Sequence, residues 1–420
     1  MITALRGTAD ILPPATALWQ FAEHTARDLF ARYGYAEIRT PVFEQTELFV
    51  RSIGDTTDIV EKEMYTFADK KGRSLTLRPE GTACVVRACL EHKLFAQARV
   101  QKYYYLGPMF RYERPQAGRQ RQFHQIGVEL FGSYSPLADA EVISLMVRFF
   151  EAAGISGLSV NINSLGDADS RAAYRDLLRE FIEPKAGQLC PDCQRRIERN
   201  VLRVLDCKVP LCKEALEAPG MPTTVSALSG PARAHYQRVL ESLTAMGIPF
   251  REDARLVRGL DYYTHTIFEV THTALGAQDA MGGGGRYDGL IEQMGGPATG
   301  GVGFALGVER LVIALQHVAR KAQQAAKTVY LVSCDEPALA ENLVLADALR
   351  RAGITALAGY EQQSMKAQLR HANAAGARWA VIRGSDERAQ GAVRLKNMET
   401  GDEALVPTVA LVEKLRETGR

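Results

Sequence analysis

Two stretches decide the fold: GPMFRYERP at residues 107–115 and RQFHQIGVELF at residues 121–131. They predict two strands, at 101–112 and 121–132, on either side of a polar loop. Side chains alternate along a strand, so one face of the second strand carries Arg121, Phe123, Gln125, Gly127 and Glu129. Pairing the two strands sets Arg111 opposite this row. A ring, an amide, a carboxylate and a guanidinium on one surface indicate a small-molecule site, although a polar face in solvent is the alternative for any isolated strand.

The surrounding sequence predicts an α+β domain in which an antiparallel sheet is flanked by helices. Helices are expected at 16–33, 82–94, 136–153 and 306–319, and strands at 35–43, 65–67, 75–77, 256–272, 282–285 and 301–305. Pro41 cannot give an amide hydrogen to a ladder, so its strand should lie at an edge or beside an interface. Charged helix patterns fill 168–250 and predict a mostly helical insertion. We expect the domain to span 1–325, interrupted by that insertion.

A second, smaller domain is predicted at 326–420. After a polar linker at 321–327, strands and helices alternate, which is typical of an α/β fold. Strands are expected at 328–333, 354–358, 379–383 and 393–397, and helices at 337–352, 364–375 and 409–417.

The composition is that of a globular protein, with 46% hydrophobic and 24% charged residues. No apolar run approaches the ~20 residues of a membrane helix, and the N-terminal segment lacks the pattern of a secretory signal. We therefore expect a cytoplasmic protein. The 51 Lys and Arg nearly balance the 49 Asp and Glu, whereas proteins that depend mainly on phosphate contacts are usually more basic. Local basic patches can still recognise RNA, so the net charge does not decide this point.

Four of the seven cysteines are close in sequence: Cys190, Cys193, Cys207 and Cys212. Their spacing is near that of zinc ribbons, but the second pair is wide. Reduced thiols are the default interpretation, a structural zinc ion is the less favoured alternative, and no metal ligand is assigned.

Residues 107–115, followed by Arg119 and by RQFHQ at 121–125, resemble motif 2 of the class II aminoacyl-tRNA synthetases in its histidine-specific form. Other segments resemble the same family in the same order. RGTAD at 6–10 is similar to its opening, Pro41 to the dimer-interface proline of motif 1, and GVGFALGVERL at 301–311 to motif 3. LVRGLDYY at 256–263 and GGGRYD at 283–288 are similar to histidine-specific signatures. The resemblance covers essentially the whole chain.

The resemblance implies three catalytic residues: Arg111 on the α-phosphate of ATP, Arg310 near the γ-phosphate, and Arg258 bridging the α-phosphate and the histidine carboxylate. Arginine suits these roles because its planar fork holds phosphate oxygens and stays charged. The same resemblance implies ATP-binding roles for Glu113, Arg119 and Phe123, with the Phe123 ring stacked on adenine. It also implies a histidine-binding set of Glu80, Gly81, Thr82, Arg111, Gln125, Glu129, Arg258, Tyr262, Tyr263 and Tyr287. Glu129 and one tyrosine are expected to recognise the imidazole.

The activity implied by the resemblance is that of a homodimeric ligase. It would activate L-histidine with ATP and Mg²⁺ to histidyl-adenylate and pyrophosphate, and transfer histidine to the terminal adenosine of tRNA(His). The C-terminal domain resembles an anticodon-binding domain, and the insertion resembles the part that faces the acceptor stem. One alternative is the synthetase-like regulatory subunit of ATP phosphoribosyltransferase, which typically lacks the anticodon-binding domain. Another is a class II synthetase for a different amino acid, which would leave Arg258 with its Asp-Tyr-Tyr triplet unexplained.

Overall fold

The computed structural model describes residues 1–55, 57–116, 118–207, 209–216, 219–272, 280–319 and 328–417. Two compact units, Met1–Ala319 and Arg320–Arg420, are described separately below. The expected linker at 321–327, and the expected domain boundary within it, lie outside the described residues. Among the helices of these ranges, none combines the length and the apolar character that crossing a bilayer requires.

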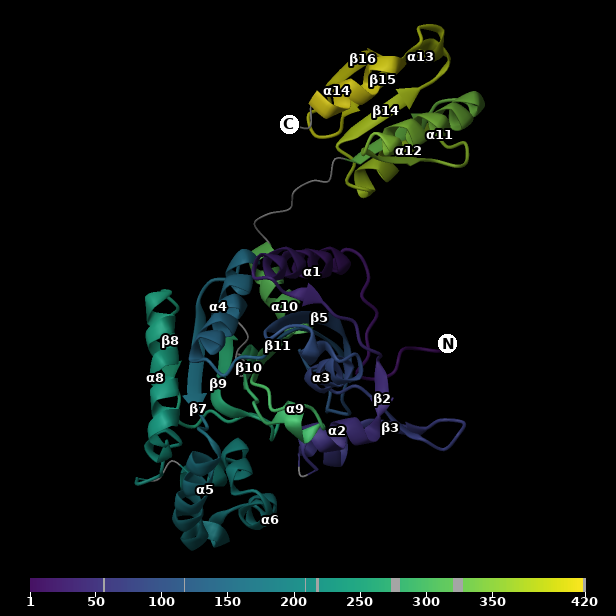
Figure 1. Ribbon diagram of the computed structural model, residues 1–420. Coiled ribbons are helices and arrows are strands. Elements are labelled where there is room, and N and C mark those ends of the chain that lie inside the picture. The colour runs from purple at the N-terminus through teal and green to yellow at the C-terminus, as the bar shows by residue number, and fades with distance from the viewer. Residues whose placement is uncertain are drawn as a thin grey trace. The chain divides into compact units, whose positions relative to one another are not determined.

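The first unit is built on an eight-stranded sheet with the order β1-β5-β6-β11-β10-β9-β7-β8 (Figure 1). The inner strands pair antiparallel, and only β1 with β5 and β7 with β8 run parallel. In sheet order the strands are Ala36–Glu37, Gln101–Phe110, Gln122–Phe131, Gly301–Gly307, Ala280–Arg286, Thr264–His272, Leu158–Ser164 and Phe250–Glu252. The expected antiparallel sheet is therefore confirmed, and the run of glycines at 282–285 forms part of β10, a central strand.

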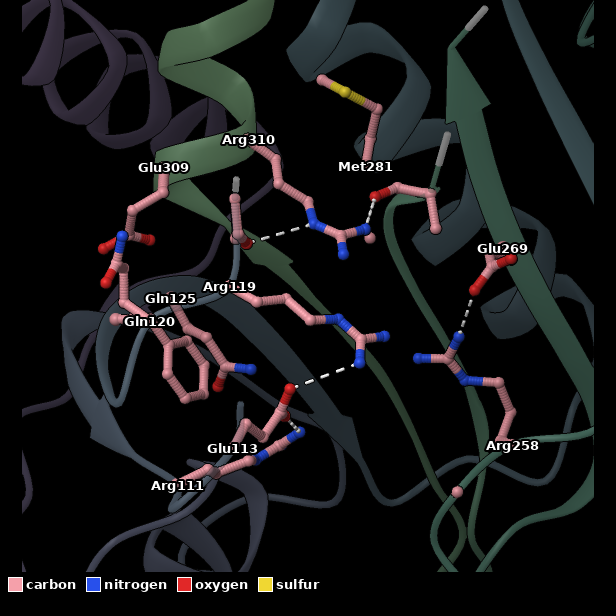
Figure 2. Close-up of a pocket in the computed structure, with 16 residues that line it drawn as sticks. Arg111, Glu113, Arg119, Gln120, Gln125, Arg258, Glu269, Met281, Glu309 and Arg310 are labelled. Carbon is pink, nitrogen blue, oxygen red and sulfur yellow. Dashed lines mark hydrogen bonds and ion pairs between the residues drawn. The ribbon is translucent and has the colours of Figure 1, made fainter. Parts of the chain in front are cut away.

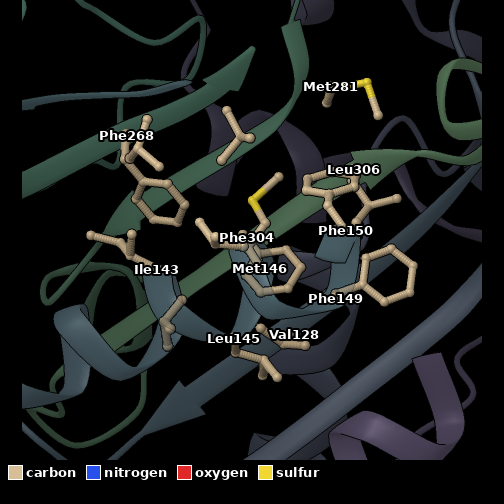
Figure 3. Packing of buried hydrophobic residues seen from close by; sticks show 14 of the residues in the cluster. Val128, Ile143, Leu145, Met146, Phe149, Phe150, Phe268, Met281, Phe304 and Leu306 are labelled. Carbon is tan, nitrogen blue, oxygen red and sulfur yellow. The ribbon is translucent and has the colours of Figure 1, made fainter. Parts of the chain in front are cut away.

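One face of the sheet is covered by the large hydrophobic core. Phe268, Phe304 and Val128 project from three different strands into a cluster that also contains Phe149 and Phe150 of α4 (Figure 3). Four helices cover this face: α1 (Ala15–Arg32), α4 (Pro136–Ala152), α8 (Gly230–Ala245) and α10 (Val308–Ala319). Burial of this apolar surface is the main contribution to the stability of the unit.

The ends of two of these helices are set by capping residues. Ser135 precedes α4 and accepts a hydrogen bond from the Leu137 amide, while Ser229 precedes α8 and accepts one from the Ala232 amide. Such caps satisfy amides that have no partner inside the helix.

The opposite face of the sheet carries a smaller core with α3 (Thr82–Glu91) and α9 (Leu290–Gln293). Tyr105 and Met109 of β5 belong to this core, whereas Tyr104 belongs to the larger one. This division follows from the alternation of side chains along a strand, and it places the predicted Phe123–Glu129 row on the face with the smaller core.

A buried ion pair joins the sheet to the helices behind it. Arg286 at the end of β10 donates from Nε to both oxygens of Asp139 in α4, at 3.1 Å, and both side chains are fully buried. His235 of α8 lies 3.4 Å from the same carboxylate. The neighbouring Arg286 guanidinium lowers the pKa of Asp139 even though burial opposes its charge.

A cluster of α-helices follows β7 and encloses a small core of its own. They are α5 (Ala168–Ile182), α6 (Pro191–Arg199) and α7 (Pro210–Leu216), and their core includes Tyr174, Leu178 and Ile197. Helix α8 also falls inside the expected insertion at 168–250, but its apolar residues Tyr236, Val239 and Leu243 belong to the large core behind the sheet. The separate helical cluster is therefore shorter than the expected segment.

The single strand expected at 35–43 is wrong. The structure divides it into β1, at the edge of the large sheet, and β2 (Phe43–Gln45). Strand β2 belongs to a separate sheet with β3 (Tyr65–Ala68) and β4 (Ser74–Leu77), which form the expected hairpin, and α2 (Thr46–Ile53) follows it. Pro41 lies between the two strands. Its ring fixes the backbone and removes an amide donor, which is the physical reason for the break.

The second unit is a five-stranded sheet with the order β13-β12-β14-β15-β16 and helices on both faces. Its strands are β12 (Thr328–Ser333), β13 (Thr355–Ala358), β14 (Trp379–Arg383), β15 (Ala392–Asn397) and β16 (Glu403–Pro407). Its helices are α11 (Glu336–Arg351), α12 (Met365–Ala374), α13 (Ser385–Ala389) and α14 (Leu411–Glu417). The α/β pattern agrees with the sequence, which missed only the short β16 and α13.

Candidate active site

A pocket of about 330 Å³ opens on the face of the large sheet that carries the smaller core. Its walls come from segments far apart in the chain: the end of β5 and the start of β6 with their connecting loop, the loop before β9, and the junction of β11 with α10. Arg111, Arg258 and Arg310 all line it, as Figure 2 shows. The three predicted catalytic arginines are thus brought to a single cavity. Glu113, Arg119, Phe123 and Gln125 line it as well.

Arg111 is held where β5 ends. Its Nε donates to the Pro79 carbonyl at 2.9 Å, and its guanidinium carbon lies 5.3 Å from the centre of the Phe123 ring. The antiparallel register that pairs Met109 with Phe123 produces this contact. Glu113 lies between two guanidinium groups, accepting a hydrogen bond from Arg119 at 3.3 Å and lying 3.8 Å from Arg111. This wall of the pocket therefore presents cations and an aromatic face, which suit phosphates and a nucleobase.

Arg258 occupies the opposite wall and lies in a loop, because β9 begins only at Thr264. The strand expected from Leu256 is therefore wrong over its first eight residues. Asp261 explains the loop: its amide donates to the Ile53 carbonyl at 3.2 Å, and its carboxylate accepts from Arg203 at 2.8 Å. These contacts with distant segments replace the hydrogen bonds of a ladder.

The Arg258 guanidinium pairs with Glu269 of β9, whose carboxylate accepts from Nη1 at 2.9 Å (Figure 2). Burial would lower the pKa of Arg258, but Tyr263, Glu269 and Tyr262 raise it above the usual value. Gly283 leaves room for this arrangement, since a Cβ there would lie 2.9 Å from Arg258 Nη1 and 2.5 Å from the Phe268 carbonyl oxygen.

Arg310 stands in the first turn of α10. Its Nε donates to the Gly118 carbonyl at 3.4 Å, and its Nη1 donates to the Ala280 carbonyl. The start of a helix favours anions because its first amides have no partner within the helix. The adjacent Glu309 accepts a hydrogen bond from the His124 amide at 2.9 Å and lies 3.0 Å from its Nδ1, which ties α10 to β6.

Two pocket carboxylates, Glu269 and Glu309, are absent from the predicted site. Glu309 directly precedes Arg310 inside the motif 3-like segment, so the sequence could have predicted it as a site residue. Glu269 lies on a strand without any motif, and only the fold brings it to Arg258.

Beside the pocket, the remaining predicted histidine-binding residues form a buried cluster, which we call the recess. Its centre is Glu129, whose side chain is only 1% exposed. Thr82 donates to the Glu129 carboxylate at 2.7 Å, and the Tyr287 hydroxyl donates to its other oxygen. Burial raises the pKa of Glu129 from 4.5 to about 8, although the hydrogen bonds from Tyr287 and Thr82 counteract part of the rise.

Aromatic rings form one side of this recess. The rings of Tyr262 and Tyr263 lie 4.7 Å apart, and Tyr262 meets Tyr287 edge-on at 5.5 Å. Two glycines of β11 make space for these side chains: a Cβ on Gly301 would lie 2.6 Å from the Tyr287 ring, and one on Gly303 would meet the Glu129 carboxylate.

Glu80 and Gly81 lie at the start of α3, next to Thr82. The Glu80 carboxylate accepts from the Thr82 amide at 2.6 Å and from the Ala83 amide at 2.9 Å, so it caps the helix. Burial raises its pKa. Each carboxylate oxygen can accept a further hydrogen bond.

The pocket and the recess are joined by β6 and by the loop before β9. Gln125 lines the pocket and Glu129 lies four residues further on the same face of the strand. The Gln125 side-chain oxygen is buried and makes no hydrogen bond among the described residues, which leaves an acceptor for a ligand. The predicted residues therefore fall into two adjacent groups, one open and cationic, the other buried with acidic and tyrosine side chains.

An antiparallel sheet that brings a motif 2-like hairpin and a motif 3-like strand and helix to one arginine-lined pocket defines a class II aminoacyl-tRNA synthetase. The family described as "Histidyl-tRNA synthetase" matches residues 7–311, and the family described as "Anticodon binding domain" matches residues 328–418. The chain belongs to the histidyl-tRNA synthetase family.

Individual relatives agree over their full lengths. The chain is 50% identical to the Histidine--tRNA ligase of Desulforudis audaxviator over 421 residues, which is all of both chains. It is 48% identical to that of Natranaerobius thermophilus, covering 99% of this chain and 98% of the relative. The crystal structure of apo S. aureus histidyl-tRNA synthetase superposes with a TM-score of 0.83 at 37% identity, covering 99% of this chain and 100% of the other.

Proposed function

We propose that the arginine-lined pocket and the buried recess form one active site in which histidine reacts with ATP. The chain is a histidine–tRNA ligase, an ATP-dependent aminoacyl-tRNA synthetase. The main observation that supports this active site is that Arg111, Arg258 and Arg310 line a single cavity. In this activity an oxygen of the histidine carboxylate attacks the α-phosphorus, a new P–O bond forms, and pyrophosphate leaves.

The arginines have separate roles in this step. Arg111 and Arg258 approach from opposite walls and neutralise the charge that accumulates at the α-phosphate, while Arg258 also holds the histidine carboxylate beside it. Arg310 binds the leaving phosphates. Phe123 stacks on the adenine, with Glu113 and Arg119 beside it. ATP brings Mg²⁺ with it, and the carboxylates lining the pocket are the oxygen donors that this ion prefers.

Glu129 and a tyrosine of the recess select the amino acid by binding the imidazole, while Glu80, Gly81 and Thr82 at the start of α3 receive the ammonium group. Gln125 accepts a further hydrogen bond through its unpartnered side-chain oxygen. A recess of buried polar groups rejects apolar amino acids because their side chains leave those groups unpaired, often by about 10⁴-fold or more.

The histidyl group then passes to the ribose of the terminal adenosine of tRNA(His), with release of AMP. The second unit binds the anticodon, since it matches the anticodon-binding family, and the helical cluster α5–α7 faces the acceptor stem. The activity belongs in the cytoplasm, where ATP and tRNA are available.

The active form is a homodimer. Val42 and Phe43 follow Pro41 at the start of β2 and are 39% and 49% exposed, so they offer apolar surface to a second copy. Sedimentation equilibrium at micromolar concentration should give twice the mass of the chain, and the mass of a single chain would contradict this.

ATP–pyrophosphate exchange across all twenty amino acids tests the proposed activity. Exchange with histidine alone is expected. Exchange with another amino acid would contradict the histidine-binding recess, and no exchange with any of them would support a regulatory protein instead. Aminoacylation of a tRNA(His) transcript, with a transcript of different identity as the control, tests the transfer step.

A further inference from the structure

The four cysteines of the helical cluster meet at one point. The sulfur atoms of Cys190, Cys193, Cys207 and Cys212 all lie within 4.8 Å of one another. The first two are at the start of α6, Cys207 follows the 3₁₀ helix Val201–Asp206, and Cys212 is in α7. The second pair of cysteines is widely spaced in the sequence, which disfavoured a metal site. In the structure Cys212 of α7 nevertheless lies close to the other three sulfur atoms, because the start of α7 lies near the start of α6.

One sulfur–sulfur distance matches a tetrahedral ion, and the others are at most 4.8 Å. Four sulfurs at ~2.3 Å from a zinc ion at the centre of a tetrahedron lie about 3.8 Å from each other, and Cys190 Sγ lies 3.8 Å from Cys207 Sγ. This separation is far longer than the ~2.05 Å of a disulfide, and all four cysteines are free.

The surroundings of the sulfurs also suit a metal site. Cys193 and Cys212 are fully buried, Cys207 is 7% exposed and Cys190 is half-buried, so three of the four sulfur-bearing residues are shielded from water. The Cys190 amide donates to Cys212 Sγ at 3.2 Å, and such amide donors stabilise negative sulfur. Four neutral thiols would leave this centre with only weak donors and acceptors.

Two of the helices in the cluster are short. Helices α6 and α7 contain nine and seven residues, which is shorter than helices that are stable by themselves. Small folds with little apolar core commonly gain their stability from a bound metal or from disulfides.

We propose that Cys190, Cys193, Cys207 and Cys212 bind one structural Zn²⁺ ion as thiolates. An all-sulfur tetrahedral set selects zinc over hard cations such as Mg²⁺, and four protein ligands leave no open position for catalysis. The ion fixes the segment that holds Arg203, whose Nη2 donates to the Gly259 carbonyl at 3.1 Å and to Asp261 at 2.8 Å. The zinc site thus stabilises, through Arg203, the loop that contains Arg258.

Metal analysis of the full-length protein tests the proposal. After expression without a histidine tag and purification without chelators, plasma mass spectrometry should find about one zinc per chain. Cys193→Ser and Cys207→Ser should each lower the zinc content at least tenfold. The matched control is Cys334→Ser, because Cys334 is an exposed cysteine of the second unit, and this variant should keep the full zinc content.

A second measurement keeps the test independent of variants that fail to fold. Titration of the wild-type protein with an organic mercurial should release zinc in proportion to the thiols modified, and refolding with Co²⁺ should give the strong visible absorption of tetrahedral cobalt thiolate. Two results would overturn the proposal: a folded protein without zinc whose four thiols react freely with a disulfide reagent, or an equimolar content of iron in place of zinc.

Discussion

Glu129 shows how the fold can place a carboxylate where its charge is unfavourable. The side chain is buried among Tyr287, Tyr105 and Thr82, and desolvation raises its pKa to about 8. A protein retains such a group when a ligand uses it, and a buried acidic group beside a pocket is a candidate for binding. The raised pKa favours the protonated form of Glu129 in the free protein, and a ligand N–H donor favours the charged form.

Replacing Glu129 with glutamine should separate binding from stability. The amide keeps the size of the side chain and loses the charge, so the KM for histidine in pyrophosphate exchange should rise about tenfold or more, which corresponds to the loss of one charged hydrogen bond.

Because the pKa of Glu129 is raised on folding, the stability that this side chain contributes is complete below pH 4.5 and is lost as the pH rises towards 8.

Wild-type protein should therefore lose stability relative to Glu129→Gln between pH 6 and pH 8, by at most about 1.4 kcal/mol per pH unit. Thermal melts at several pH values measure this difference. Glu151→Gln on the surface of α4 serves as the control and should follow the wild type. A constant difference between Glu129→Gln and wild type across this range would contradict the raised pKa.

Arg258 is the residue whose replacement should affect the chemical step most. Arg258→Ala removes one of the cations beside the α-phosphate, so the single-turnover rate of adenylate formation should fall by about 10²- to 10³-fold, with a smaller change in histidine affinity. Arg148→Ala, at a partly exposed arginine of α4 outside the pocket, is the control. Rapid-quench measurement of adenylate gives the rates of Arg258→Ala and of the control. An unchanged rate in Arg258→Ala would exclude the proposed role.

At the scale of elements, the hairpin β5–β6 could be predicted almost residue by residue. Its side chains alternate cleanly, and the face that carries Phe123, Gln125 and Glu129 lies where the pattern placed it. Most helices were equally clear, since apolar spacing and capping residues are local signals. Arg111 could be placed opposite this face because antiparallel pairing follows from the hairpin itself.

Other parts depend on contacts that no local pattern contains. The loop from Leu256 to Tyr263 resembles a strand in sequence, but Arg203 and Ile53 hold Asp261 away from any ladder. Glu269 becomes a site residue only because β9 lies against that loop. Helix α8 looked like part of the insertion because its charged pattern continues that segment, while its apolar side packs on α4.

Glycines of β11 test whether this strand must pack closely against the side chains of Glu129 and Tyr287. In Gly303→Ala the added methyl group would meet the Glu129 carboxylate and lie 3.0 Å from the Tyr287 hydroxyl. Overpacking of this kind costs about 1–3 kcal/mol, so the thermal midpoint of the first unit should fall by several degrees. Gly307→Ala, on the same strand with no atom within 4 Å of the new Cβ, is the matched control. Scanning calorimetry compares them, and equal midpoints would contradict the tight packing of the recess.

At the scale of the whole molecule, the two units have separate hydrophobic cores. The cores on the two faces of the eight-stranded sheet contain residues of the first unit only. The cores on the two faces of the five-stranded sheet contain residues of the second unit only. All residues of the pocket and the recess also lie in the first unit. The amino-acid chemistry and the recognition of the anticodon are therefore assigned to parts that can be tested one at a time.

A chain that ends before Thr328 should keep the first reaction and lose the second. Because the first unit contains both the pocket and its supporting cores, histidine-dependent pyrophosphate exchange should stay within about threefold of the full chain. Charging of tRNA(His) at limiting tRNA should fall about 100-fold or more, which corresponds to roughly 3 kcal/mol of lost binding. Parallel assays on one preparation, with circular dichroism as a check on folding, give both values. A folded truncated chain whose exchange falls as far as its charging would show that the chemistry requires the second unit.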